Sequence, residues 1–243
     1  LVPLGPKDGI ALVSANAASL GTGALALHDA AVVLAAQRAA LALSLEGFRG
    51  NLDPFDPRLA KVRAAPGQAE AAAAVLKLLK GGALTKPGAA RRVQDPLSFR
   101  CFPSVLGAAM AALASAMLVL EEELNSGGDN PAVLAEDGEM ISTGNFDITA
   151  LVLEFERLGQ ALAQTAILAA QRIHKMQSQS LTDLPRFLSP RGAMHAGVAG
   201  LGKVASALES DIRHLAQPCS LLVLPTADGI EDYATMAPRV VAK

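Results

Sequence analysis

Aromatic side chains and net charge are both scarce in this sequence. None of its 243 residues is tryptophan, Tyr233 is the sole tyrosine, and the formal net charge is −2. Proteins that bind nucleic acid neutralise phosphates with clustered Lys and Arg, and the only such cluster here is Arg91-Arg92. The composition therefore excludes nucleic acid as a main partner.

Cysteine is rare as well. Cys101 and Cys219 lie far apart without the spacing of a metal site, and the four histidines form no His-x-x-x-His pair. The sequence has no phosphate-binding loop, no strand-led GxGxxG and no nucleophile elbow, which removes support for the common nucleotide-binding and hydrolase classes. These absences predict reduced thiols in a cytoplasmic protein, and no metal site.

Apolar residues, in contrast, make up 51% of the chain, which is enough to bury a sizeable core. Residues 9–27 and 102–120 each run 19 residues without a charge, about the length that crosses a bilayer. Both runs consist mainly of Ala, Gly and Ser with few bulky apolar residues, and no tryptophan is present to form an interfacial belt. We expect buried helices of a soluble bundle and no membrane partner.

Alanine-rich segments that are poor in strand-forming residues predict the secondary structure. They cover about 17–46, 68–80, 104–125, 147–179 and 193–216, and each is bounded by Gly, Pro, Asn or Asp. Polar turns at 45–59, 125–133, 136–147 and 225–233 connect them. The sequence predicts an all-α fold, a bundle of long helices that forms a single domain over 1–243.

The segment VQDPLSFRCFP (93–103) places one cation, Arg100, in an apolar run. Asp95 and Pro96 read as the N-cap and first residue of a short helix over 96–102, which Pro103 interrupts. A planar guanidinium in an apolar wall is suited to bind a carboxylate through two hydrogen bonds. The alternative is an internal salt bridge to a glutamate of the bundle.

Three polar turns carry further candidate residues. Asp129-Asn130-Pro131 is a tight turn that could present the Asn130 amide to a cleft, and Phe146 could form an aromatic wall. Glu231 either opens a helix or supplies a base to a pocket. Taken singly, each of these turns is equally compatible with a structural role.

Six segments occur in a particular order along nearly the whole chain. They are PKDGIAL (6–12), PFDPRLAKVRAAPGQ (54–68), VQDPLSFRCFPSVLGAA (93–109), DNPAV (129–133), GNF (144–146) and PTADGIEDYATM (225–236). Together they resemble the second half of the histidine and aromatic amino acid ammonia-lyases. The start, LVPLGPKDG, has no initiator methionine and no signal-peptide pattern, so we expect it to lie inside a longer sequence whose first half is absent here.

The resemblance implies a fold, an assembly and a reaction. Members of this family are homotetramers built on a long-helix bundle, each active site combines three subunits, and the reaction removes ammonia from an α-amino acid. Their electrophile is a methylidene-imidazolone, which forms autocatalytically from an Ala-Ser-Gly tripeptide and involves no metal. Because that tripeptide belongs to the absent half, we expect this chain alone to be inactive.

The resemblance also assigns roles to residues. Arg100 matches the arginine that binds the substrate carboxylate, Asn130 an asparagine beside that carboxylate, and Gln94 a polar site residue. Phe146 matches an aromatic residue near the electrophile. Glu231 matches the glutamate of the histidine-specific branch, where phenylalanine-specific relatives generally carry glutamine, so it favours histidine as the substrate.

Two positions depart from the family pattern. Leu97 replaces a tyrosine that helps in proton handling, and Ser14 replaces an asparagine that contacts the prosthetic group, with Asn16 two residues further on. Tyr233, close to Glu231, is a candidate to take over part of the missing tyrosine's role. These departures leave two alternatives open, a catalytically degenerate helical scaffold and an aminomutase that uses the same group.

Overall fold

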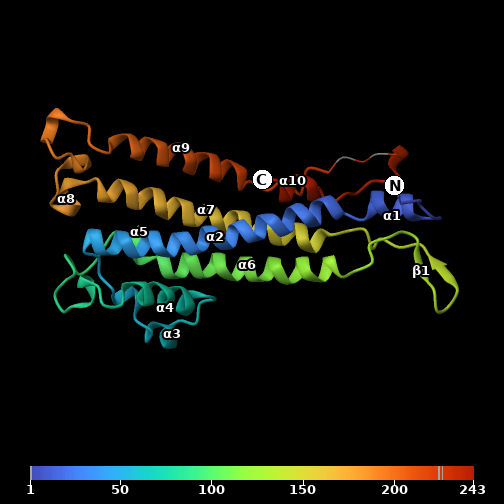
Figure 1. The fold of residues 1–243 in the computed structure, drawn as a ribbon, viewed down its shortest axis with the longest axis horizontal. Helices are drawn as coiled ribbons and strands as arrows, with labels where there is room; N and C mark the ends of the chain where they lie inside the picture. The colour runs from blue at the N-terminus through green and yellow to red at the C-terminus, as the bar shows by residue number, and fades with distance from the viewer. Residues whose placement is uncertain (1, 224, 226) are drawn as a thin grey trace. The chain divides into compact units, whose positions relative to one another are not determined.

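The computed structural model describes residues 2–223, 225 and 227–243, and most of them are helical (Figure 1). The predicted all-α class is confirmed. The longer helices are α2 (Ala17–Phe48), α4 (Gln68–Leu79), α6 (Phe102–Leu124), α7 (Thr149–Met176) and α9 (Ala199–Leu215). The shorter ones are α1 (Asp8–Ser14), α3 (Leu59–Val62), α5 (Leu97–Arg100), α8 (Gln179–Thr182) and α10 (Ala237–Val241). Single 3-10 turns lie at Asp53–Phe55, Ala83–Thr85, Arg186–Leu188, Gly192–Met194 and Ala227–Gly229.

The predicted start of the helix over 193–216 is wrong by six residues. Helix α9 begins at Ala199, after a 3-10 turn and a bend. Gly197 has a φ of +53°, and a Cβ there would lie 2.3 Å from the Phe187 carbonyl oxygen. This backbone conformation suits glycine and is incompatible with a continuous helix.

The expectation that Asp95 caps a helix over 96–102 is also wrong. Helix α5 spans Leu97–Arg100, and the Asp95 carboxylate instead accepts a hydrogen bond from the Asn51 backbone N–H at 2.5 Å. Cys101 separates α5 from α6, which begins at Phe102, and Pro103 therefore lies in the first turn of α6. Proline is tolerated there because the first N–H groups of a helix have no intrahelical acceptor.

A small hairpin occupies the region that the sequence predicts as two loops. Strand β1 (Ala132–Leu134) pairs antiparallel with β2 (Glu139–Ile141), and Val133 lies opposite Met140. Gly138, at a φ of +69°, occupies the connecting turn. The hairpin is a local addition to the helical fold.

The chain packs as two compact units. Unit 1 comprises 1–29, 113–158 and 217–243, and unit 2 comprises 30–112 and 159–216. Each unit therefore combines segments that are far apart in sequence. The single domain over 1–243 stays a prediction.

The core of unit 1 forms between the ends of the long helices. Its buried apolar residues include Leu20, Leu27, Ala116, Leu120, Ile148, Leu151, Val152, Phe155, Leu158, Val240 and Val241. Gly23 on α2 allows a close approach, since a Cβ there would lie 3.0 Å from the Phe155 ring. The Glu156 carboxylate is buried in this unit and pairs with the Lys243 ammonium at 2.5 Å.

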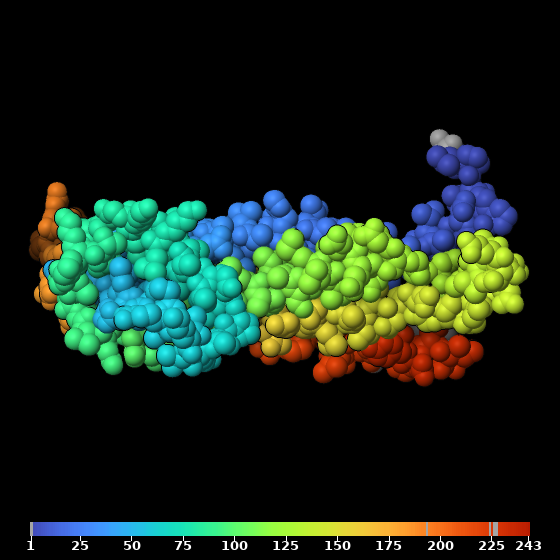
Figure 2. All heavy atoms as spheres, turned by 90° about the horizontal axis from the view of Figure 1, so that it is seen from below, coloured from blue at the N-terminus to red at the C-terminus, as the bar shows by residue number. Residues whose placement is uncertain are grey.

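The core of unit 2 is built around stacked aromatic rings. The Phe48 and Phe99 rings are parallel to within 16°, with their centroids 4.4 Å apart. The buried Arg172 guanidinium lies over the Phe102 ring at 5.0 Å and donates to the Ser98 carbonyl at 3.2 Å. Burial lowers the pKa of Arg172 to about 10. The segment from the end of α2 to α5 gathers on one face of this unit (cyan to green in Figure 2).

Helices α2 and α6 are long and apolar enough to cross a membrane by length and composition. In their most apolar windows, 33% of the α2 residues and 44% of the α6 residues are buried inside the structure. Core helices of soluble proteins meet the same criterion, so the absence of a membrane partner stays a prediction. Within the described residues, no group of three or more His, Cys, Asp or Glu side chains is placed to hold a metal ion.

Candidate functional site

The candidate residues divide between the two units. Unit 1 contains Ser14, Asn16, Asn130, Phe146, Glu231 and Tyr233. Unit 2 contains Gln94, Leu97 and Arg100.

Arg100 is the last residue of α5 and is half-buried. Its Nε is buried and makes no hydrogen bond to any described residue, and no described carboxylate lies within 4.0 Å of its guanidinium. The internal salt bridge considered for this residue is therefore absent from the described part of the chain. The guanidinium retains its capacity to bind an anion.

Asp95 is an acidic residue whose pKa is affected by the charge of Arg100. The Asp95 side chain is 3% exposed, and its Oδ1 is buried without a hydrogen-bond partner among the described residues. Burial raises the pKa of this carboxyl, while the Asn51 N–H and the charges of Arg92 and Arg100 oppose that rise. Asp95 thus lies near Arg100 without forming an ion pair with it.

Leu97 and Gln94 flank Arg100 on the same segment. Leu97 is 61% exposed and lies three residues before Arg100 on α5, so the two side chains share one helix face. Gln94 is exposed just before the helix. This face combines an apolar side chain, a half-buried cation and a polar amide.

Asn130 lies in unit 1, at the centre of a hydrogen-bonded turn. Its Oδ1 accepts a hydrogen bond from the Thr143 N–H at 2.8 Å, and its backbone N–H donates to Asp129 Oδ1 at 2.8 Å. The Lys7 ammonium pairs with Asp129 Oδ2 at 2.7 Å and donates to the Pro131 carbonyl at 2.9 Å. The hydrogen bond from Lys7 holds the pKa of Asp129 below its ordinary value.

Asn16 and Phe146 are brought together in the same unit. The Asn16 amide donates to the Phe146 carbonyl oxygen at 2.7 Å, and the Phe146 ring is 43% exposed. Asn16 adopts a φ of +51°, a conformation that asparagine tolerates better than most residues. Ser14, the last residue of α1, is half-buried.

Glu231 and Tyr233 follow the last 3-10 turn, and both are exposed. The Tyr233 hydroxyl hydrogen-bonds to Thr149 Oγ1, at the first residue of α7, over 2.9 Å. Thr226, in the same motif, lies outside the described residues. The geometry thus places the one tyrosine hydroxyl at the start of α7.

The sequence reasoning missed Lys7 and Asp129. Both belong to segments that carry the resemblance, PKDGIAL and DNPAV, and they have opposite charges in polar turns. That combination was the available signal for a contact between the two segments. The structure shows that this ion pair ties the start of α1 to the turn that holds Asn130.

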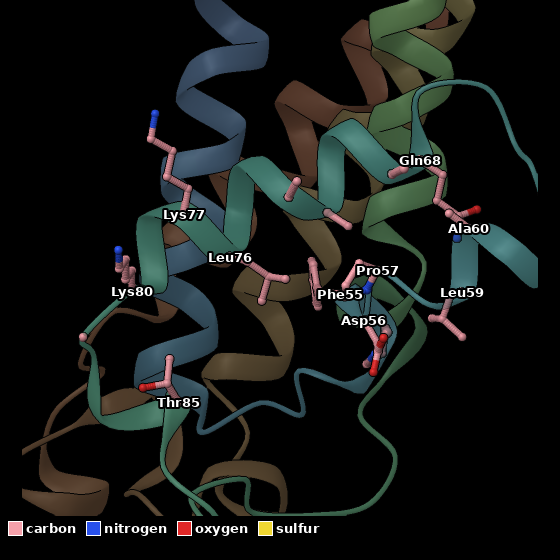
Figure 3. A pocket seen from close by; sticks show the side chains of 15 residues that line it. Phe55, Asp56, Pro57, Leu59, Ala60, Gln68, Leu76, Lys77, Lys80 and Thr85 are labelled. Atoms are coloured by element: carbon pink, nitrogen blue, oxygen red, sulfur yellow. The ribbon is translucent and has the colours of Figure 1, made fainter.

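A cavity of about 620 Å³ opens in unit 2, but it contains none of the candidate residues. Phe55, Leu59 and Leu76 contribute to an apolar lining, and the Lys77 and Lys80 side chains extend outward from it (Figure 3). The cavity and the Arg100 segment are therefore separate features of the unit.

Comparison with known proteins identifies the class. The family model described as aromatic amino acid lyase matches residues 1–243, and the chain belongs to this family. Its helical structure is part of the ammonia-lyase fold. The predicted resemblance is confirmed.

Three proteins of this family show which members the chain is similar to. The chain is 36% identical to histidine ammonia-lyase from Anaeromyxobacter dehalogenans over 246 residues, covering 100% of the chain and 48% of that protein. It is 32% identical to ergothionase from Treponema denticola, an ergothioneine-degrading enzyme, with a TM-score of 0.94 over 99% of the chain and 48% of that protein. It is 26% identical to a phenylalanine aminomutase from Pantoea agglomerans, with a TM-score of 0.88 over 98% of the chain and 51% of that protein. The chain thus spans about half the length of the relatives it matches, and it is similar to part of a histidine ammonia-lyase.

Proposed function

We propose that the protein containing this chain is a histidine-type ammonia-lyase, which removes ammonia from an α-amino acid and leaves an α,β-unsaturated acid. The 36% sequence identity to a histidine ammonia-lyase supports this proposal. Glu231 also supports it, because the resemblance places a glutamate at this position in the histidine-specific branch of the family. The observation that carries it is Arg100, a half-buried cation without a described carboxylate partner. A substrate carboxylate would supply the missing partner.

In this proposal, each candidate residue has a task defined by its chemistry. Arg100 and Asn130 bind the substrate carboxylate, and Gln94 adds a polar contact. Glu231 accepts a hydrogen bond from an imidazole N–H. Leu97 cannot transfer a proton, so the Tyr233 hydroxyl is the group in this chain that would take part in proton handling.

The prosthetic group must come from outside these residues, because the 243 residues contain no Ala-Ser-Gly tripeptide. Ser14, Asn16 and Phe146 fit beside such a group, since an exposed phenyl face and a nearby amide suit a flat, neutral ring. When present, the methylidene-imidazolone supplies the electrophile of the elimination. We propose that the complete protein is a homotetramer whose active sites each combine three subunits, acting on a small amino acid in the cytoplasm.

The test is turnover by the full-length protein and its Arg100→Met variant, followed by the ultraviolet absorbance of urocanate from L-histidine. We expect kcat/KM to fall about 100-fold in Arg100→Met and less in Arg100→Lys, because the lost contacts are charge-assisted hydrogen bonds. Arg58→Met, which removes a cation from an exposed pair with Asp56, is the control and should retain the parent value. An Arg100→Met variant as active as the parent would contradict the proposal.

The same assay separates the substrate classes. L-Phenylalanine and ergothioneine are offered beside L-histidine, since one similar structure is that of an ergothioneine-degrading enzyme. If the protein converts ergothioneine and not histidine, ergothioneine is the substrate. The proposed role of Arg100 in binding the substrate carboxylate would still hold. The 243-residue chain by itself should produce no urocanate.

Two alternatives have an observation in their favour. Leu97 and Ser14 depart from the catalytic pattern and favour a degenerate scaffold, which would be inactive on every amino acid offered. The similarity to an aminomutase favours a product in which the amino group has moved to the β-carbon. Chromatography of the products distinguishes the three outcomes.

A further inference from the structure

One hydrogen-bonded network connects three segments of unit 1 that are far apart in sequence. Lys7, just before α1, contacts Asp129 and the Pro131 carbonyl, which lie on either side of Asn130. Asn130 in turn accepts from Thr143, and the Thr143 side chain accepts from the Asn145 N–H at 2.7 Å. The network therefore runs from the PKDGIAL segment through DNPAV to GNF.

The network defines the direction of the Asn130 amide. Because Oδ1 accepts the Thr143 N–H, both amide donors remain on Nδ2. No acceptor among the described residues is hydrogen-bonded to Nδ2. Two donors with no internal acceptor are suited to a carboxylate.

Lys7 fixes the turn that carries this amide. A single ammonium bridges the residue before Asn130 and the residue after it, at 2.7 Å and 2.9 Å. Lys7 itself adopts a φ of +70°, which is unfavourable for a lysine and requires support from the surrounding contacts. The Lys7 and Asp129 side chains are 26% and 28% exposed, so solvent only partly screens the pair.

We propose that Lys7 and Asp129 are positioning residues, which hold the Nδ2 donors of Asn130 toward the substrate carboxylate. This inference rests on the proposed function, because it assumes that the carboxylate binds at Asn130. Neither residue touches the substrate. Each acts through the turn at 129–131.

The experiment replaces Lys7 in the full-length protein and measures both turnover and L-histidine binding. In Lys7→Met, KM and the calorimetric Kd should rise about ten-fold while kcat stays within about two-fold, because a weakened carboxylate contact affects binding more than the chemical step. Lys7→Arg, which keeps a cation, should recover most of the affinity. Arg157→Met, which removes a cation from an exposed pair of the same unit, is the matched control and should keep the parent Kd.

Hydrogen exchange of the peptide 126–146 gives a readout that does not depend on substrate. Lys7→Met lacks the ion pair with Asp129, so hydrogen exchange in this peptide should be faster than in the parent. Arg157→Met retains that ion pair and should exchange at the parent's rate. If Lys7→Met does not fold, Asp129→Asn tests the same pair with a side chain of nearly the same shape. An unchanged Kd in a folded variant that lacks the ion pair would overturn the inference.

The outcomes for the two proposals are distinct. A parent protein that binds L-histidine without converting it would contradict the ammonia-lyase function, while its variants would still decide the positioning role through Kd. A parent that converts histidine, with Lys7→Met at the parent KM, would contradict the positioning role alone. A parent that neither binds nor converts an amino acid would overturn both.

Discussion

Glu156 shows how one buried carboxylate is accommodated in unit 1. Its Oε1 accepts the backbone N–H groups of Cys219 at 2.8 Å and Ser220 at 3.0 Å, and its Oε2 pairs with the Lys243 ammonium at 2.5 Å. Burial by itself raises the pKa of this carboxyl, but Lys243 and the two N–H groups outweigh burial, and the pKa lies below its ordinary value. The folded protein therefore favours the charged form of Glu156.

That pKa predicts the sign of a pH effect on stability. A carboxyl with a lowered folded pKa contributes stability above its unfolded pKa and loses it as the pH falls through the folded pKa. We expect the free energy of unfolding, measured with urea at pH 7 and at pH 4 or below, to fall more for the parent than for Glu156→Gln. The reason is that the glutamine side chain carries no charge that protonation could remove. Glu154→Gln, two residues earlier on α7 and paired with the exposed Arg157, should follow the parent. Parallel pH profiles for the parent and Glu156→Gln would contradict this account.

The helices were predictable because the residues that signal them are close together in sequence. The contacts between distant segments were not predictable, because no local pattern indicates them. Alanine content and boundary residues predicted α2 and α4 to within two residues at each end. The β1–β2 hairpin was missed because three-residue strands have too short a pattern to distinguish from a turn. Asp95 was misassigned because its partner, Asn51, lies 44 residues away. For the site, the motifs predicted Arg100 and Asn130, and that assignment stays a prediction, whereas the pairing of Lys7 with Asp129 is visible only in the fold.

The contact between α6 and the start of α4 gives a prediction for a helix element. A Cβ on Gly107 would lie 2.5 Å from the Gly67 carbonyl carbon, so Gly107→Ala should destabilise unit 2 by about 1–3 kcal/mol through overpacking. Gly159, inside α7, has nothing within 4 Å of the corresponding Cβ position. Gly159→Ala should therefore stabilise the protein by about 0.5–1 kcal/mol, because alanine is the better helix former. Chemical denaturation of both variants measures these changes, and equal effects of the two substitutions would refute the close contact.

The chain covers 48% of the length of the histidine ammonia-lyase from Anaeromyxobacter dehalogenans. Exposed apolar side chains on α9 bear on the proposed homotetramer. Leu201, Val204 and Leu208 are each more than 50% exposed, and Ile212 and Leu215 continue the same stripe at helical spacing. An exposed apolar stripe of this kind is typical of a surface that another chain segment covers. The proposed homotetramer offers a second copy of the protein as that cover.

Replacing one residue of this stripe tests the assembly. Leu208→Asp places a charge in the middle of the stripe, where burial against a second copy would require its desolvation, so the variant should dissociate to smaller species. Ser210→Asp introduces the same side chain on the other side of α9, and it should keep the parent's assembly. Light scattering coupled to size-exclusion chromatography of the full-length protein measures the mass of each. If both the parent and Leu208→Asp are tetramers, the stripe lies outside the interface. A monomeric parent would contradict the proposed homotetramer itself.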